Sequence, residues 1–248
     1  MSAGYSPITA DLHIHTALSP CAEDEMTPAR IVEAAISRRL GCIAITDHNS
    51  AENVSAVMAA GVARGLWVIP GMEVQTIEEV HILGLFHDLW DVLAFQNVIY
   101  SALPPDRNCE EFFGQQLLLD DHDTIVGKCD RLLLASTGLS FEGVCDVISE
   151  YGGIAIPSHI DRPAFSVIRT LGFIPPEARV FAVEVSPRTS VKEATQKFPE
   201  IARFPIVISS DAHRLVDIGR GFTTLEIRER SLEGLKEALI RERGHSLA

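Results

Sequence analysis

The sequence predicts an α/β fold in which short buried strands alternate with helices. Almost wholly apolar runs, such as Cys42-Ile43-Ala44-Ile45 and Ile154-Ala155-Ile156-Pro157, are typical of parallel strands buried on both faces. Helical patterns separate such runs repeatedly along the chain, as expected of successive βα units. The length of 248 residues suits one large domain with a substantial core. We therefore expect a single domain over residues 1–248.

The first third of the chain contains expected strands at residues 6–10, 42–46, 66–70 and 80–86. A helix is expected to begin at Thr27-Pro28, because Thr is a favoured N-cap and Pro a favoured first helical residue, and to end at Gly41. A second helix is expected over residues 51–64, interrupted at Gly61.

Residues 88–138, called the excursion below, are predicted to leave the regular alternation. A helix is expected over residues 89–103, ended by Pro104-Pro105, and two short strands flank a turn at residues 120–123. The excursion is too short and too polar to hold a core of its own, so it is not expected to form a separate domain.

The alternation of strands and helices resumes after the excursion. Further helices are expected at residues 141–151 and 231–241, and further strands at residues 154–157, 180–185, 205–208 and 222–227.

Ionisable side chains gather where these strands end. His13 and His15 lie one residue apart on an extended segment, so both imidazoles point to the same face and can reach one cation. The other residues of this kind are Asp47, His48, Glu73, His159, Asp211 and His213. Ligands bind at the carboxyl ends of strands in folds of this type. The pattern therefore predicts a metal site at this edge.

The motifs resemble those of the PHP (polymerase and histidinol phosphatase) superfamily of metal-dependent phosphoesterases. They are Asp11-Leu12-His13-Ile14-His15-Thr16, Ile45-Thr46-Asp47-His48-Asn49, Gly71-Met72-Glu73-Val74, Pro157-Ser158-His159 and Ser209-Ser210-Asp211-Ala212-His213. The resemblance implies a distorted (β/α)7 barrel with a metal cluster at the C-terminal mouth of its strands.

The resemblance also implies three overlapping sets of ligands for two to three divalent ions. They are His13, His15, Glu73 and Asp211 for the first metal, His48, His213 and Cys21 for the second, and Glu73, His81 and His159 for the third. Cys21 stands where His or Asp is usual in this family, and a thiolate favours zinc or iron over magnesium. Zn, Mn or Fe is therefore expected. An inert thiol is the alternative for Cys21, and a hydrogen-bonded core histidine is the alternative for His81.

Two further residues are expected to assist catalysis. Asp47 is expected to orient His48 without binding metal itself. Arg162 follows His159 closely and can bind a phosphate through its planar guanidinium group. A surface salt bridge is the alternative for Arg162.

This set of residues predicts a metal-dependent hydrolase of phosphate esters, either a phosphomonoester or a small nucleotide. Metals of this kind lower the pKa of a bound water towards neutrality and hold the phosphate oxygens. We therefore expect in-line attack by a metal-bound hydroxide.

Three alternatives remain at this stage. An amidohydrolase shares the strand-end His-x-His, but none of the lysines that could serve as its carboxylated bridge ends an apolar strand; they are Lys128, Lys192, Lys197 and Lys236. A PHP-type nuclease is disfavoured by an acidic composition, and a purely structural PHP domain is disfavoured by the nearly complete ligand set.

Composition limits the partners and the location. The net charge of −13, from 34 acidic and 21 basic residues, makes nucleic acid an unlikely partner and leaves a small anionic phosphate ester as the expected substrate. No apolar run is long enough for a membrane span. The five cysteines show no paired spacing, and Met1 to Tyr5 shows no basic start of a signal peptide. A cytoplasmic protein with reduced thiols is expected.

Overall fold

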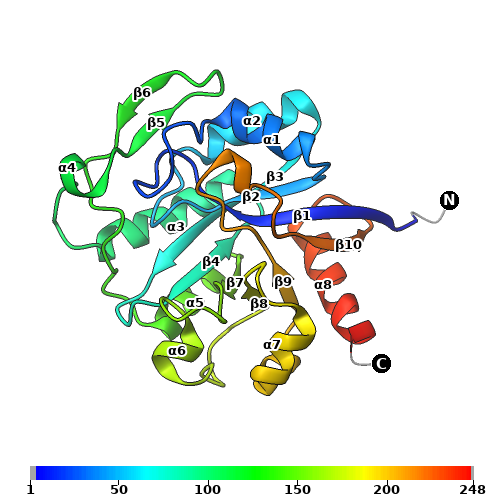
Figure 1. Ribbon diagram of the computed structural model, residues 1–248. Helices are drawn as coiled ribbons and strands as arrows, with labels where there is room; N and C mark the ends of the chain where they lie inside the picture. The colour runs from blue at the N-terminus through cyan, green and yellow to red at the C-terminus, as the bar shows by residue number, and fades with distance from the viewer. Residues whose placement is uncertain (1–3, 247–248) are drawn as a thin grey trace.

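The computed structural model describes residues 4–246, and its centre is a curled six-stranded sheet (Figure 1). The strand order is β10-β1-β2-β3-β4-β7. The bounds are β1 Ser6–Ile14, β2 Cys42–Ile45, β3 Trp67–Gln75, β4 His81–Leu85, β7 Ile154–Pro157 and β10 Thr223–Ile227. The fold is mixed α/β, as the sequence predicts.

The sheet is not wholly parallel, and this corrects the expectation of uniform βα units. β1, β2 and β3 are mutually parallel, but β4 is antiparallel to both β3 and β7, and β10 is antiparallel to β1. The reason lies in a short connection. Only residues 76–80 join β3 to β4, whereas a parallel crossover needs a dozen residues or more.

A parallel pair, β8 (Val183–Val185) and β9 (Ile206–Ile208), continues the curl. An isolated parallel bridge joins Ala155 in β7 to Val180, just before β8. Another joins Ile14 at the end of β1 to Ala212, just after β9. These bridges bring the ends of β7, β8 and β9 back towards the end of β1, so the strand ends face a common space.

Helices pack on the curled sheet (Figure 1), most of the longer ones against one face and the C-terminal helix against the cluster on the other face. The longer ones are α1 Pro28–Ser37, α2 Val54–Arg64, α3 Leu89–Ala102, α5 Phe141–Glu150 and α8 Leu232–Ser246. Neighbouring strand residues enter two different cores. Ile43 and Ile45 pack against the helical layer, whereas Cys42 and Ala44 join a second cluster that also holds Leu235 of α8. Burial on both faces explains why these strands read as unbroken apolar runs.

Two helices differ from the sequence prediction at the glycine that was expected to end or interrupt them. α1 ends at Ser37 with Arg38 as its C-cap, not at Gly41, and the Thr27 side chain makes no capping hydrogen bond. α2 continues through Gly61 without a break. A Cβ atom at Gly61 would lie 2.5 Å from Val68 Cγ2, so this glycine allows close packing of α2 on β3.

The excursion contains α3, the short helix α4 (Glu110–Phe113) and a hairpin of β5 (Leu117–Leu119) and β6 (Ile125–Lys128). It packs beside the loop that follows β1. The Leu117 amide donates to the Ala17 carbonyl, and the Asn53 amide group donates to the Leu117 carbonyl. The loop that carries Cys21 is therefore fixed from outside the sheet.

The remaining short helices were not predicted. They are α6 Val167–Leu171, α7 Val191–Lys197, and the 3-10 turns η1 Pro199–Arg203 and η2 Leu215–Asp217. None of the helices formed by residues 4–246 is long and apolar enough to cross a membrane.

Candidate metal centre

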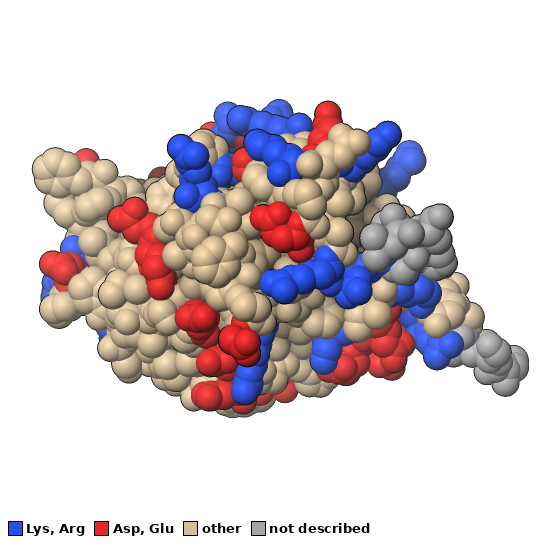
Figure 2. All heavy atoms as spheres, turned by 90° about the horizontal axis from the view of Figure 1, so that it is seen from below, with Lys and Arg blue, Asp and Glu red and all other residues tan. Residues whose placement is uncertain are grey.

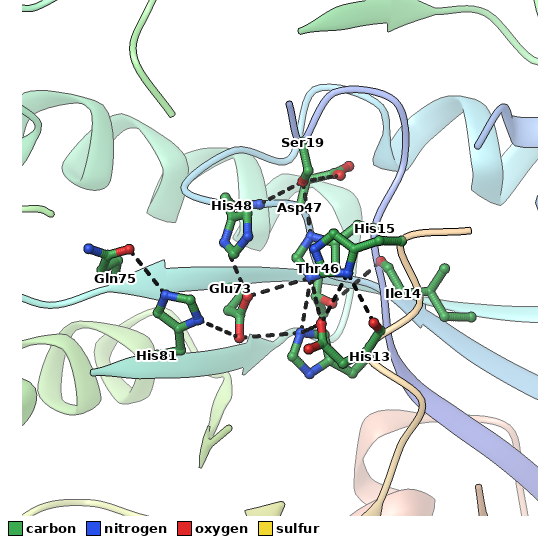
Figure 3. Close-up of polar contacts among 12 residues, drawn as sticks. His13, Ile14, His15, Ser19, Thr46, Asp47, His48, Glu73, Gln75 and His81 are labelled. Carbon is green, nitrogen blue, oxygen red and sulfur yellow. Dashed lines mark hydrogen bonds and ion pairs between the residues drawn. The ribbon is translucent and has the colours of Figure 1, made fainter. Parts of the chain in front are cut away.

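Eight of the expected ligand side chains converge at one edge of the sheet, and Figure 3 shows several of them. They are His13, His15, His48, Glu73, His81, His159, Asp211 and His213. Most of them lie at or after the ends of parallel strands. His81 is instead the first residue of β4, and it reaches the same edge because β4 runs in the opposite direction.

The tightest group contains His13, His15, Glu73 and Asp211. The His13 Nε2 atom lies 3.1 Å from His15 Nε2, 3.2 Å from Asp211 Oδ1 and 3.3 Å from Glu73 Oε1. His15 Nε2 lies 3.2 Å from Asp211 Oδ1 and 3.5 Å from Glu73 Oε2. The four side chains thus surround one point with their donor atoms.

This spacing fits a metal ion. Four ligands at 2.0–2.1 Å in a tetrahedron are separated by about 3.3–3.4 Å, close to the distances between these side chains. Within the described residues, Glu73 Oε1 and Asp211 Oδ1 are buried and accept no hydrogen bond. Buried carboxylate oxygens without donors are costly unless a cation lies between them. The donor set therefore fits a divalent cation.

Two further groups share members with the first. His15, His48 and His213 form one, and His48, Glu73 and His81 form the other. His159 is placed slightly farther out, with Nε2 3.6 Å from Glu73 Oε1. Glu73 lies at the centre of the whole cluster, because its two oxygens face five imidazole rings.

Cys21 lies at the outer side of the second group. The residue is exposed, and its thiol forms hydrogen bonds with His213 and His48. Burial of the thiol raises its pKa, but these two bonds outweigh that effect and lower the pKa from 9.0 to about 6. Cys21 thus lies beside the rings of His48 and His213, but its sulfur is not among the ligand atoms that gather within 4.8 Å of one another.

Burial and neighbouring charges shift the pKa values of the cluster in different directions. Burial raises the pKa of Glu73, but the rings of His81 and His13 lower it well below its usual range. Burial also raises the pKa of Asp211, and the His13 ring reverses this effect. Burial and the neighbouring His213 and His48 rings lower the pKa of His15. Burial lowers the pKa of His13, but Glu184 and Glu73 raise it well above its usual range. Burial also lowers the pKa of His48, but Cys21 and Glu73 raise it to about 10. Ionised carboxylates and neutral imidazoles are the forms that bind metals, so a bound metal would displace protons from these two rings.

Glu184 is a buried residue of the centre that the sequence analysis missed. The two oxygens of Glu184 lie 3.1 and 3.0 Å from His13 Nδ1, and one of them accepts a hydrogen bond from the His159 amide. This contact favours a proton on Nδ1 and leaves Nε2 free to face the cluster. A charged residue inside the apolar run Val183-Glu184-Val185 was the available signal.

Other polar residues hold the ligands in place. The Ser19 hydroxyl donates to Asp47 and lies 2.9 Å from His15 Nδ1, while the Gln75 side-chain oxygen lies 3.1 Å from His81 Nε2. Asp47 also accepts from the backbone and hydroxyl of Thr16. The hydrogen bonds of Asp47 thus lead through Ser19 both to the His15 ring and to the His48 backbone amide.

Arg162 lies at the rim of the centre. Its guanidinium is about one-third exposed and contacts Asp211 Oδ2 at 2.5 Å. The expected ion pair is therefore formed with a residue of the first group, while part of the guanidinium stays open to solvent.

Family comparisons agree with this architecture. The PHP domain model matches residues 11–166, and the PHP-associated model matches residues 196–243. The chain therefore belongs to the PHP domain family. Its convergent His, Glu and Asp side chains form groups that could hold metal ions.

Two curated relatives are similar over part of the chain. A segment of 86 residues is 37% identical to the 5′-3′ exoribonuclease Rnm of Salmonella typhimurium and covers 32% of this chain and 28% of that protein. A segment of 78 residues is 33% identical to the 3′,5′-nucleoside bisphosphate phosphatase of Chromobacterium violaceum and covers 30% and 26%, respectively. The similarity thus spans less than a third of either relative.

Solved structures share the fold at low sequence identity. The lesion-specific endonuclease PfuEndoQ from Pyrococcus furiosus has a TM-score of 0.74 and 18% identity, with 94% of this chain and 56% of that chain covered. An amidohydrolase from Chromobacterium violaceum has a TM-score of 0.60 and 19% identity, with 95% and 96% covered. At this level of identity, the likeness concerns the fold alone.

Proposed function

We propose that this protein hydrolyses small phosphate esters with two to three divalent ions, Zn, Mn or Fe, held at the strand-end cluster. The observation that carries the proposal is the group of His13, His15, Glu73 and Asp211, whose spacing fits a tetrahedral ion. His48, His213 and Cys21 would hold a second ion, and His81, His159 and Glu73 a third. Bound metals would supply Lewis-acid stabilisation of phosphate oxygens and an activated water.

The chain's own residues would bind and orient the ester. Arg162 can share its guanidinium between Asp211 and a phosphate oxygen, because its donors form a planar fork. Beside the cluster, an open cavity of about 590 Å³ is lined by Arg162, Arg169 and Lys197 and by one acidic residue, Asp161. These cations stand out in a chain of net charge −13 and favour an anionic substrate.

We infer further that the curled sheet is the distorted (β/α)7 barrel of this family. Its seven strands would be β1, β2, β3, β4, β7, β8 and β9, with β10 added at the open edge. A single domain and a cytoplasmic location are part of the same proposal.

Nuclease activity is the second candidate, because Rnm is named as an exoribonuclease and PfuEndoQ as an endonuclease. The surface charge favours the small substrate. Acidic and basic side chains are interspersed on the face seen in Figure 2, and no broad basic footprint covers it. The amidohydrolase alternative is less favoured, because it would need a buried lysine beside the clustered ligands. The four lysines are exposed or only half-buried.

Two assays on the metal-loaded protein test the proposal. Phosphate release should be seen from a panel of phosphomonoesters and nucleoside bisphosphates, and an Asp211→Ala variant purified in parallel should release none. A 5′-labelled single-stranded RNA and a duplex DNA are tested beside the panel. Cleavage of the polynucleotides without turnover of any small ester would replace the proposal with the nuclease alternative.

A further inference from the structure

Phe165 places an exposed aromatic ring directly against the metal centre. Its ring is stacked on the ring of His81, with centroids 4.4 Å apart and planes inclined by 16°. One face is therefore covered by a proposed ligand. The residue nevertheless stays 41% exposed, so much of the ring faces solvent beside the cluster.

The loop after β7 holds this ring in an unusual backbone conformation. Phe165 has a φ of 57°, in the left-handed region that bulky residues avoid, and His159 at the start of the loop has a φ of 30°. The Phe165 carbonyl accepts a hydrogen bond from the His81 amide, and the Ser166 hydroxyl donates to the Ile160 carbonyl. Strain of this kind is typical of functional sites, since the surrounding structure must maintain it.

Shielding the His81 ring from water does not by itself explain why an aromatic residue stands at position 165. An aliphatic side chain would exclude water from the His81 ring equally well, without leaving a flat apolar face open to solvent. Aromatic faces beside phosphate-binding groups are the platforms on which nucleobases stack, because every base has a π-face. Arg162, which forms an ion pair with Asp211, lies on the same loop as Phe165, so a phosphate and a planar ring could be bound together.

We propose that the exposed face of Phe165 binds the planar base of the leaving group, which makes nucleotides the preferred phosphate esters of this protein. The inference rests on the proposed phosphoesterase function, and it narrows the substrate class. Phe165 is then a specificity-determining residue that takes no part in bond breaking.

Binding without turnover tests the inference independently of catalysis. The probes are the 5′-methylenephosphonate analogue of adenosine monophosphate and the matching ribose analogue that lacks the base, because a C–P bond is not hydrolysed. Their Kd values are measured by calorimetry on the metal-loaded protein, for the wild type and for Phe165→Leu and Phe165→Tyr. Trp90→Leu is the matched control, because Trp90 is an aromatic residue that is 78% exposed. It lies near the start of α3, which follows the far end of β4 from His81.

The wild type should bind the adenosine probe about tenfold more tightly than the ribose probe. This ratio should fall to near one in Phe165→Leu and persist in Phe165→Tyr and Trp90→Leu. Equal affinity of the wild type for the two probes, or binding of neither, would overturn the inference. So would an equal loss for both probes in Phe165→Leu, since Phe165 would then only cover His81. A base-dependent ratio without any ester hydrolysis would refute the proposed function and leave only the base-binding role of Phe165 standing.

Discussion

The Nδ1 atom of His13 lies 3.1 and 3.0 Å from the two carboxylate oxygens of Glu184, a residue 171 positions later in the sequence. Both side chains are fully or almost fully buried. The same carboxylate accepts the amide hydrogen of His159. Glu184 thus couples the end of β1 to the loop after β7, and it orients a ligand without facing the cluster itself.

Replacement of Glu184 by Gln should weaken metal binding by about 10–100-fold, because the amide keeps the shape but loses the charge that aligns His13. Competition with a chromophoric chelator measures the affinity, and circular dichroism verifies that the fold is retained. Glu233→Gln, on the exposed face of α8, is the matched control. Equal metal affinity in both variants would show that Glu184 has no positioning role.

Removal of a first-group ligand should empty the centre. His13→Ala or Asp211→Ala takes away one member of the tightest donor set, so elemental analysis should find fewer ions per chain and phosphoesterase turnover should be lost. Chelation should lower the Tm of the wild type, since a ligand that binds only the folded state stabilises it. The two variants should show a much smaller shift. Near-normal turnover in either variant would contradict the assignment of this group.

The sequence predicted the convergence of the site better than the geometry of the sheet. The ends of apolar runs identify His13, Glu73 and Asp211, because burial on both faces leaves a simple pattern. Strand direction is not encoded in that pattern. The antiparallel course of β4 depends on the length of its connection to β3, which the sequence analysis did not weigh.

Contacts between distant segments were the other missing part. Glu184 meets His13 because the sheet curls, and no local pattern indicates which strand will face which. Asp47 was expected to orient His48, and its hydrogen bonds lead through Ser19 to the His48 amide but also to the ring of His15, which was not expected. The sequence predicts which residues near a motif belong to the site, but it does not predict which distant side chains contact them.

Gly61 provides a test of how closely α2 packs on β3, which the helix pattern in the sequence could not show. Alanine has the higher helix propensity, by about 1 kcal/mol. Its Cβ would nevertheless lie 2.5 Å from Val68 Cγ2 and 3.1 Å from the Leu66 carbonyl oxygen, which is backbone and cannot rotate away. We expect Gly61→Ala to destabilise the protein by about 1–3 kcal/mol, as overpacking does.

Urea denaturation of Gly61→Ala measures this difference in the free energy of unfolding. Ser55→Ala, at an exposed position of the same helix, is the control and should change stability little. A net gain in stability for Gly61→Ala would mean that α2 can move away from β3 at no cost.

Cys21 distinguishes this centre from the usual ligand pattern of its family. Its thiol contacts the rings of His48 and His213, so metal bound between these rings should shield the sulfur from alkylation. Chelation should therefore increase the rate at which iodoacetamide labels Cys21, as followed by peptide mass spectrometry. Cys109 is also exposed and serves as the internal control, with an expected rate that does not depend on metal.

Substitution of Cys21 extends the same test to metal preference. Cys21→Asp should shift the preference towards Mn or Mg, since a carboxylate is a harder ligand than a thiolate. Cys21→Ala should weaken one bound ion and reduce turnover while the Tm of the metal-free protein stays close to that of the wild type. If the labelling rate of Cys21 is the same with and without chelator, and alanine costs no metal, the cysteine only packs beside the two histidines. The second site would then consist of His15, His48 and His213, which already face one another.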